Sequence, residues 1–469
     1  MSMRKINTIS GNPYIIEPIE PEIPEFTGGD YEERLELLIG RMKDNKITHA
    51  VIYADREHFS NMEYLTGFDP RFEEALLIVS QEGEMTILIG NEGWDYSFKI
   101  PLDVKRMLYQ NFSLQGQPRE SLRPLYDIFK EAGMNRVSKI GVIGFKYFEP
   151  KHMKDHSRKV DIPSYIVEEL AEAVPRERII NFTGVMTNLV SGIRMVLRNP
   201  KEIAYYEYVA NKASNCVINM LKGLKPGITE LEASQNARFD AWPICMFPII
   251  NFGADRVQLG LSSPGHRELK EGDIITLCYG IRGSLVSKSG LAVSGVEKVP
   301  ENLTDFVEDF YQPFFRALVT WYESIHVGAD CGEVFDKVMA IIGDREKFGV
   351  VLNPGHNIGG DEWVNSPFFK GSKYMVRGGY YLQADIIASS PNPFRQAIAE
   401  DGIVVADESL RAELRLRYPD VFGRIQKRRD FMKTVMGINL SDDVLPLSNC
   451  QAVMHPYMLD TKRFFAIEA

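Results

Sequence analysis

The feature that most constrains the fold of this chain is a change in the order of its predicted elements near Gly192. Before that residue, helical and strand patterns alternate. Residues 31–45 carry leucines and Met42 at helical spacing. Strand patterns follow at THAVIYAD (48–55), at the hairpin-like pair ALLIVS (75–80) and MTILIG (85–90), and at SKIGVIGF (138–145). This alternation predicts a small α/β domain.

After Gly192, helices and strands occur in separate blocks. Residues 199–224 predict a long helix that Pro200 opens, since proline is tolerated in a first helical turn. Further helices are predicted at 225–244, with Thr229 as N-cap, at 301–325 and at 331–342. Strands are predicted at MFPIINFG (246–253), DIITLCYGI (273–281), YYLQADIIAS (380–389) and AIAEDGIVVAD (397–407). This arrangement predicts an α+β fold for the larger domain.

Four parts follow from these patterns. Residues 1–30 form an extended proline-rich arm, because the prolines of NPYIIEPIEPEIPEFTG exclude a helix there. Residues 31–190 form the smaller α/β domain, and residues 191–407 form the larger α+β domain. Residues 408–469 are expected to be a helix-rich extension that packs on the larger domain.

Composition argues against some functional classes. The net charge is −10 and no basic stripe is present, so nucleic acid is not an expected partner. No uncharged apolar stretch reaches about 18 residues, so no membrane span is expected. MSMRKINTISGNPY lacks the apolar run of a signal peptide. The five cysteines are scattered and form no CxxC pair, which favours a reducing compartment and predicts a cytoplasmic protein.

Several segments resemble one known family. EYLTGFDPRFEEALLIVS (63–80) and GIRMVLRNPKEIAYYEYVANKA (192–213) are similar to segments of creatinase and prolidase-like enzymes. LKEGDIITLCYG, NPGHNIGG, RGGYYLQADII and AIAEDGIVV follow in the order that the family uses. The chain thus resembles the creatinase, aminopeptidase P and prolidase superfamily from about residue 30 to 407. This resemblance implies a pita-bread domain preceded by a smaller creatinase-like domain.

The resemblance also implies a site at which two Asp, one His and two Glu hold two divalent ions in the active peptidases. Here the first Asp position is Cys278, interpreted as a small buried residue, and the second is Ser289, or Lys288 if a gap falls nearby. Neither serine nor lysine can bridge two cations as a carboxylate does. A catalytic His of the family is replaced by Trp363. The His expected before the first Asp block is missing as well, since Gly260 and Leu261 stand there and His266 is out of register.

Three family positions keep a ligand side chain. His356 matches the ligand His, Asp385 stands for a ligand Glu, and Glu400 falls on the bridging Glu, followed by Asp401 as in the family. The resemblance assigns these three mainly to one ion. We therefore expect no dinuclear centre and no cofactor, or at most one divalent ion at His356, Asp385 and Glu400.

Three functions remain open at this point. The first is a metal-independent or mononuclear hydrolase of a small amide or C–N substrate, with His356, Asp385 and Glu400 as catalytic residues. The second is a non-enzymatic binding module in which Lys288 pairs with Asp385 and Glu400 in place of a metal. The third is a conventional Xaa-Pro dipeptidase. The expected partners are a small-molecule or short peptide ligand and, by resemblance to the superfamily, a second copy of the chain in a homodimer.

Overall fold

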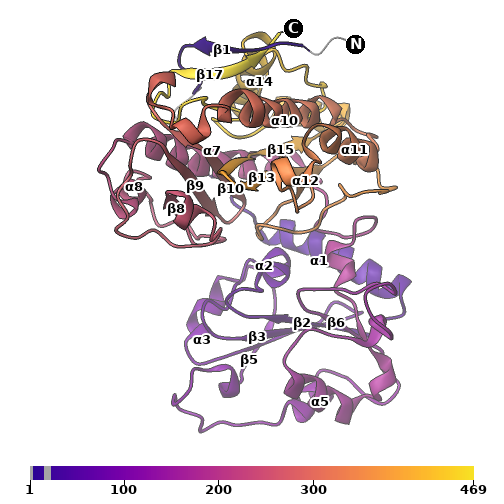
Figure 1. Cartoon of the computed structure of the whole chain (residues 1–469). Helices are drawn as coiled ribbons and strands as arrows, with labels where there is room; N and C mark the ends of the chain where they lie inside the picture. Colours follow the sequence, from indigo (N-terminus) through magenta and orange to yellow (C-terminus); the bar gives the residue numbers. More distant parts are fainter. Residues whose placement is uncertain (1–3, 15–22, 469) are drawn as a thin grey trace. The chain divides into compact units, whose positions relative to one another are not determined.

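The computed structural model describes residues 4–14 and 23–468, which divide into two units (Figure 1). Glu25–Met195 forms the N-terminal unit, and the described residues before Glu25 join those from Val196 onward in the C-terminal unit. The central part of the predicted proline-rich arm, residues 15–22, lies outside the described residues. None of the described helices is long and apolar enough to cross a membrane.

The N-terminal unit is built on a six-stranded sheet with the strand order β5-β4-β3-β2-β6-β7. The predicted hairpin is confirmed: β3 and β4 pair antiparallel, and Gly83 turns between them with φ of 97°. The strands are β2 (His49–Ala54), β3 (Ala75–Ser80), β4 (Met85–Ile89), β5 (Lys105–Leu108), β6 (Ile140–Ile143) and β7 (Ile179–Asn181). The helices are α1 (Gly28–Asp44), α2 (Ser60–Thr66), α3 (Gly93–Tyr96), α4 (Leu125–Glu131), α5 (Ser164–Ala173) and α6 (Gly184–Thr187).

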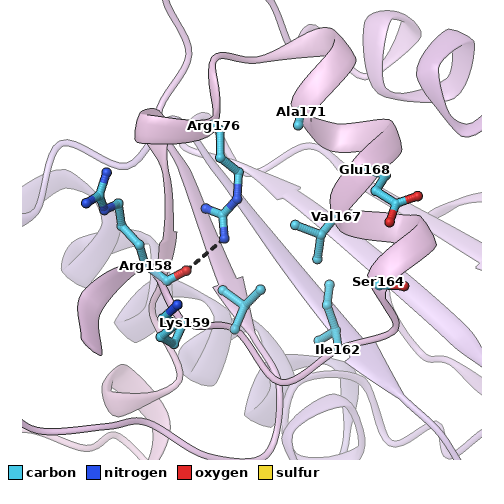
Figure 2. A pocket seen from close by; sticks show the side chains of 9 residues that line it. Arg158, Lys159, Ile162, Ser164, Val167, Glu168, Ala171 and Arg176 are labelled. Atoms are coloured by element: carbon cyan, nitrogen blue, oxygen red, sulfur yellow. Dashed lines mark hydrogen bonds between the residues drawn. The ribbon is translucent and has the colours of Figure 1, made fainter. Parts of the chain in front are cut away.

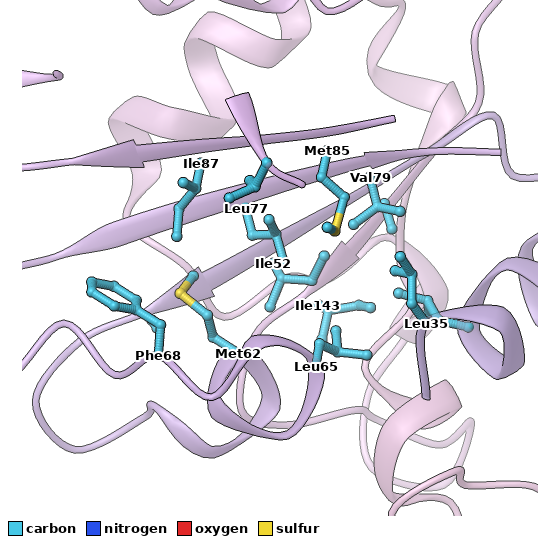
Figure 3. Close-up of a cluster of buried hydrophobic side chains, with 14 of the residues drawn as sticks. Leu35, Ile52, Met62, Leu65, Phe68, Leu77, Val79, Met85, Ile87 and Ile143 are labelled. Carbon is cyan, nitrogen blue, oxygen red and sulfur yellow. The ribbon is translucent and has the colours of Figure 1, made fainter. Parts of the chain in front are cut away.

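Both faces of this sheet are buried. Figure 3 shows apolar side chains of β2, β3 and β4, among them Ile52, Leu77 and Ile87, pointing toward Leu35 of α1 and Leu65 of α2. A second cluster covers the other face, where Val51 and Leu76 lie with residues of α4 and α5. Strands covered on both sides have continuous apolar sequences, which explains why they could be recognised from sequence.

The C-terminal unit contains a five-stranded sheet of order β13-β14-β10-β9-β8 and a four-stranded sheet of order β11-β12-β15-β16. The strands are β8 (Ile249–Phe252), β9 (Asp273–Ile281), β10 (Ser284–Ala292), β11 (His356–Asn357), β12 (Tyr380–Gln383), β13 (Ile386–Pro391), β14 (Phe394–Glu400), β15 (Gly402–Val405) and β16 (Val444–Pro446). The helices are α7 (Pro200–Gly223), α8 (Glu230–Gln235), α9 (Ala254–Val257), α10 (Gln312–Ser324), α11 (Cys331–Ile342), α12 (Arg345–Phe348), α13 (Glu408–Arg417) and α14 (Pro419–Thr434).

The chain crosses between these two sheets at two adjacent points. It leaves β12 through Ala384 and Asp385 to enter β13, and it leaves β14 through Asp401 to enter β15. The backbone N–H of Ala384 donates to the carbonyl of Asp401, 3.0 Å away, which ties the two crossings together. The segments YYLQADIIAS and AIAEDGIVVAD were each predicted as one strand, and each is in fact two strands in different sheets.

Two predicted helices also differ from the structure. The helix predicted over 225–244 is only α8, although its N-cap is confirmed because Thr229 accepts from the N–H of Glu232. Arg238 and Ala241 have φ of 55° and 64°, which a helix cannot accommodate. The helix predicted over 301–325 divides into the π-helical turn η7 (Phe306–Tyr311) and α10. Pro313 lies at the junction and cannot donate the hydrogen bond that a continuous helix needs.

The two ends of the described chain meet in the C-terminal unit. β1 (Ile6–Ser10) pairs antiparallel with β17 (Arg463–Ile467) (Figure 1). β16 pairs with β15 and so adds to the four-stranded sheet. The predicted extension 408–469 therefore begins as the helix pair α13 and α14 but continues with strands. Its apolar pieces are buried within the unit, as Leu445, Cys450 and Phe465 have no exposed surface.

Candidate functional site

The two chain crossings and strand β11 bring together the three predicted ligands. His356 begins β11, opposite Gln383 of β12, while Asp385 follows β12 and Glu400 ends β14. Gly355 approaches β12 closely, since a Cβ there would lie 2.8 Å from the carbonyl of Gln383. Its φ of 103° also requires glycine. The glycine before His356 thus allows the imidazole to lie beside both carboxylates.

The imidazole of His356 is fully buried, and one of its nitrogens points into a ring of acids. Nε2 lies 3.7 Å from Asp385 Oδ2 and 3.6 Å from Glu400 Oε1. Nδ1 contacts the carbonyl of Asn357 at 3.1 Å, which leaves the lone pair of the neutral ring on Nε2. Within residues 4–14 and 23–468, Nε2 and Asp385 Oδ1 have no hydrogen-bond partner. Buried polar atoms rarely lack a partner, so these two atoms indicate a ligand.

Sequence reasoning missed an additional acid, Glu362, in the loop after β11. Glu362 Oε1 lies 3.8 Å from His356 Nε2, and the ligand atoms of His356, Glu362 and Glu400 all lie within 4.8 Å of one another. Glu362 immediately precedes Trp363, the residue that the family alignment had singled out. No periodicity marks this position, because the loop between Ile358 and Val364 forms no regular element.

The pKa values of Asp385, Glu400 and Glu362 are all raised, because these carboxyl groups are buried close to one another. Burial raises the pKa of Asp385 well above its usual range, and the neighbouring charge of Glu400 raises it further. Burial likewise raises the pKa of Glu400, with Glu362 and Asp401 adding to the effect. Burial also raises the pKa of Glu362, although His356 opposes the shift. Carboxyl groups whose pKa values are raised in this way either take up a proton or are neutralised by a bound cation.

The wall of the site opposite these acids consists of small polar side chains. The hairpin of β9 and β10 turns through only Arg282 and Gly283, and this register sets Ser287 opposite Cys278 on one side and opposite Glu400 on the other. Ser287 is therefore the residue opposite Cys278, and the assignment of the second Asp position to Ser289 or Lys288 stays a prediction. Ser289 instead pairs with Thr276 and donates to the carbonyl of Ile275. Burial raises the pKa of Cys278, which keeps it a neutral thiol.

Lys288 does not enter the cluster of acids. Its side chain is buried and pairs with Asp401, with Nζ to Oδ2 at 2.5 Å. Asp401 also accepts from the Ser448 hydroxyl at 2.7 Å. Burial alone would lower the pKa of Lys288, but Asp401 outweighs it and raises the pKa. The expected ion pair of Lys288 with Asp385 and Glu400 is therefore wrong.

The remaining residues that the sequence singled out, Trp363, His266 and Leu261, contribute no ligand atom to the cluster of acids. Trp363 stacks on His356 with ring centroids 4.0 Å apart and an interplanar angle of 17°, so it covers one face of the imidazole. His266 is exposed in the loop before β9. Leu261, which stands where the family has a His, is 80% exposed. Trp363 thus shapes the site without donating a proton to it.

The donor set fits one divalent cation and not two. Two donors of one tetrahedral ion, each about 2.1 Å from it, lie about 3.4 Å apart. The Nε2 to oxygen distances of 3.6–3.8 Å are close to that value and too long for hydrogen bonds. A second ion needs bridging carboxylates to offset the repulsion between cations. The residues that follow Glu400 across the sheet, Ser287 on β10 and Cys278 on β9, carry no carboxylate.

The N-terminal unit has a separate cavity of about 320 Å³ beside α5. Figure 2 shows Arg176 reaching across it to the carbonyl of Arg158, at 2.8 Å. Arg176 also donates to the carbonyl of Ile179 at 3.0 Å. The guanidinium is thus already bonded to protein carbonyls, and we assign no function to this cavity.

Comparisons with known proteins agree with this description of the two units. The Creatinase/Prolidase N-terminal domain family matches residues 34–196. The prolidase from Pyrococcus horikoshii OT3 is similar over 80% of this chain and 95% of its own, with 16% identity and a TM-score of 0.58. An Xaa-Pro dipeptidase from Bacillus anthracis is similar over 81% and 96%, with 16% identity and a TM-score of 0.60. An X-Pro aminopeptidase from Thermotoga maritima MSB8 is similar over 80% and 95%, with 12% identity and a TM-score of 0.59.

A comparison with curated protein sequences found no match. The structural similarities, at these identities, show that the folds are alike: a two-domain α+β pita-bread architecture. The sequence match of the N-terminal domain and the shared architecture agree. Residues 34–196 belong to the Creatinase/Prolidase N-terminal domain family, and the chain has the fold of the prolidases and X-Pro aminopeptidases.

Proposed function

We propose that this protein is a mononuclear hydrolase that acts on a small amide or C–N substrate, such as a short peptide. The observation that carries the proposal is the position of His356 Nε2. It is buried, lacks a hydrogen-bond partner in the described part of the chain, and lies 3.6–3.8 Å from oxygens of Glu362, Asp385 and Glu400. One divalent ion held there supplies a polarised water and a Lewis acid for the substrate carbonyl.

The chain's own residues have separable tasks in this proposal. His356 and Glu400 hold the cation, and Gln383 contacts Glu400 Oε1 at 3.5 Å while donating to the carbonyl of Leu285 at 2.7 Å. Asp385 Oδ1 is the atom positioned to take a proton, since it is buried and lacks a partner within the described ranges. Trp363 covers the imidazole and limits water on that side. Acids at the site favour a substrate with a positively charged amine.

Metal analysis combined with a substrate panel tests the proposal. We expect about one divalent ion per chain after dialysis against Mn²⁺ or Zn²⁺, and hydrolysis that is lost in His356→Ala and Asp385→Asn. The panel pairs Xaa-Pro dipeptides with other dipeptides and with small amides. Purified protein that takes up no divalent ion contradicts the mononuclear hydrolase.

The two other functions predict different results. A conventional Xaa-Pro dipeptidase requires two ions per chain and turnover of Xaa-Pro dipeptides with Mn²⁺, but Cys278 and Ser287 argue against the second ion. A binding module in which Lys288 replaces the metal is disfavoured because Lys288 pairs with Asp401. We also propose a homodimer and a cytoplasmic location. Light scattering tests the first, for which a clean monomer is the contrary result, and imaging of tagged protein tests the second.

A further inference from the structure

We propose that Glu362 is a metal ligand of this protein, and that it replaces the carboxylates absent from β9 and β10. The single cation would then be bound by His356, Glu362 and Glu400, on the side of the imidazole that faces the loop after β11. This inference rests on the mononuclear site proposed above and adds to it a residue outside the set predicted from the superfamily resemblance.

The first argument is geometric. The donor atoms of His356, Glu362 and Glu400 all lie within 4.8 Å of one another, which is close enough for the three side chains to converge on one cation. The acids approach Nε2 from different parts of the chain, Glu400 at 3.6 Å from the end of β14 and Glu362 at 3.8 Å from the loop. The imidazole between them is fully buried, and Nε2 has no hydrogen-bond partner among the described residues.

The second argument is that the loop holds Glu362 in place. The N–H of Asn357 donates to the carbonyl of Asn365 at 2.7 Å, and the N–H of Val364 donates to the carbonyl of Asn357 at 2.9 Å. These bonds close the loop at its base, directly beside His356. At the tip, the N–H of Gly359 donates to the carbonyl of Asp361 at 3.1 Å. The next residue after Glu362, Trp363, is fixed by its stacking on His356. These contacts hold the backbone of Glu362 beside the imidazole.

The third argument concerns charge. The sheet offers Cys278 and Ser287 where bridging acids would be needed, and the loop offers one acid in their stead. A neutral imidazole with the carboxylates of Glu362 and Glu400 balances the charge of one divalent ion. The side chain of Glu362 is two-thirds buried, with 33% exposure, and its carboxylate lies 3.8 Å from His356 Nε2. Without a cation, Glu362 and Glu400 would repel each other in a poorly hydrated site.

Metal titration of the full-length protein, stripped with a chelator, tests this assignment. We expect wild type to bind one Mn²⁺ or Zn²⁺ by isothermal titration calorimetry, and Glu362→Gln to bind it about 10-fold or more weakly. The matched control is Asp361→Asn, which removes the neighbouring acid of the same loop and should stay within about twofold of wild type. Co²⁺ gives a second readout, since loss of a ligand changes the visible absorption spectrum of the bound ion.

Each outcome has a distinct meaning. One ion in wild type with equal affinity in Glu362→Gln and Asp361→Asn overturns the role of Glu362 and leaves the mononuclear hydrolase intact. No ion in wild type overturns the proposed function itself. Thermal unfolding in chelator shows that the variant folds, and we expect Glu362→Gln to be at least as stable there as wild type. A large loss of stability in chelator would instead assign Glu362 a structural role.

Discussion

Ser287 faces Glu400 directly across strands β10 and β14, so the residue next to this acid in the sheet carries no carboxylate. Ser287 also faces Cys278 on its other side, so neither neighbouring strand supplies a bridging acid at that level. The Cys278→Asp and Ser287→Asp double variant should restore bridging carboxylates. We expect it to bind about two Mn²⁺ per chain, against one in wild type, as measured by elemental analysis after dialysis.

The control for that experiment is the Cys278→Asn and Ser287→Asn double variant, which has similar side-chain volumes without the charge. It should keep one ion. Two ions in wild type, or one ion in the aspartate variant that folds normally, would contradict the explanation given for the altered site.

A divalent ion should stabilise the wild-type protein by binding only its folded state. At 100 times the dissociation constant, the expected gain is about 2.7 kcal/mol in the free energy of unfolding. Differential scanning fluorimetry with and without Mn²⁺, followed by chelator, measures the shift in Tm. His356→Ala should show no shift, because the nitrogen that lies between the three acids is gone. An equal shift in wild type and His356→Ala would place the ion elsewhere.

Lys288→Met should destabilise the fold without affecting the metal. The substitution leaves Asp401 buried without its counter-charge, which costs about 3–5 kcal/mol in comparable buried pairs. Urea denaturation measures this loss. The double variant Lys288→Met, Asp401→Leu should recover part of the stability, since both members of the buried ion pair are then removed. The affinity for Mn²⁺ should stay unchanged in Lys288→Met, and a strong change would revive the hypothesis that Lys288 substitutes for the ion.

Glu207 should make the C-terminal unit sensitive to acid. It lies in α7 and accepts from Arg428 at 2.8 Å and from Arg424 at 2.7 Å. Burial alone would raise the pKa of Glu207, but the two guanidinium groups outweigh it and lower the pKa. The stability that this depressed pKa contributes is fully present above the unfolded pKa of about 4.3, and is lost as the pH falls through the folded value.

Urea denaturation of Glu207→Gln checks this pH dependence. At pH 7 we expect a loss of about 3–5 kcal/mol relative to wild type, and a smaller difference below about pH 4. Glu323→Gln is the control, because the Arg4–Glu323 pair is partly exposed and should contribute about 1 kcal/mol or less. A difference that stays constant from pH 7 to well below pH 4, past the lowered pKa of Glu207, would contradict the assignment.

Much of the fold could be predicted because it depends on local patterns. The apolar runs of β2, β3 and β4 and the long helix α7 were recognisable from periodicity alone. The divisions between β12 and β13 and between β14 and β15 were not, because an apolar strand looks the same whether it stays in one sheet or crosses to another. Asp385 and Glu400 lie at those crossings, which explains why they meet.

The sequence by itself determined that an imidazole and two carboxylates recur in ordered blocks, at His356, Asp385 and Glu400. Only the tertiary structure decided that Ser287 stands opposite Cys278 and that Lys288 turns away to Asp401. Side chains alternate along a strand, so an uncertainty of one residue in the register exchanges a site residue for one on the other face. Glu362 likewise lies at the site because its loop folds back beside His356. No sequence periodicity encodes the path of such a loop.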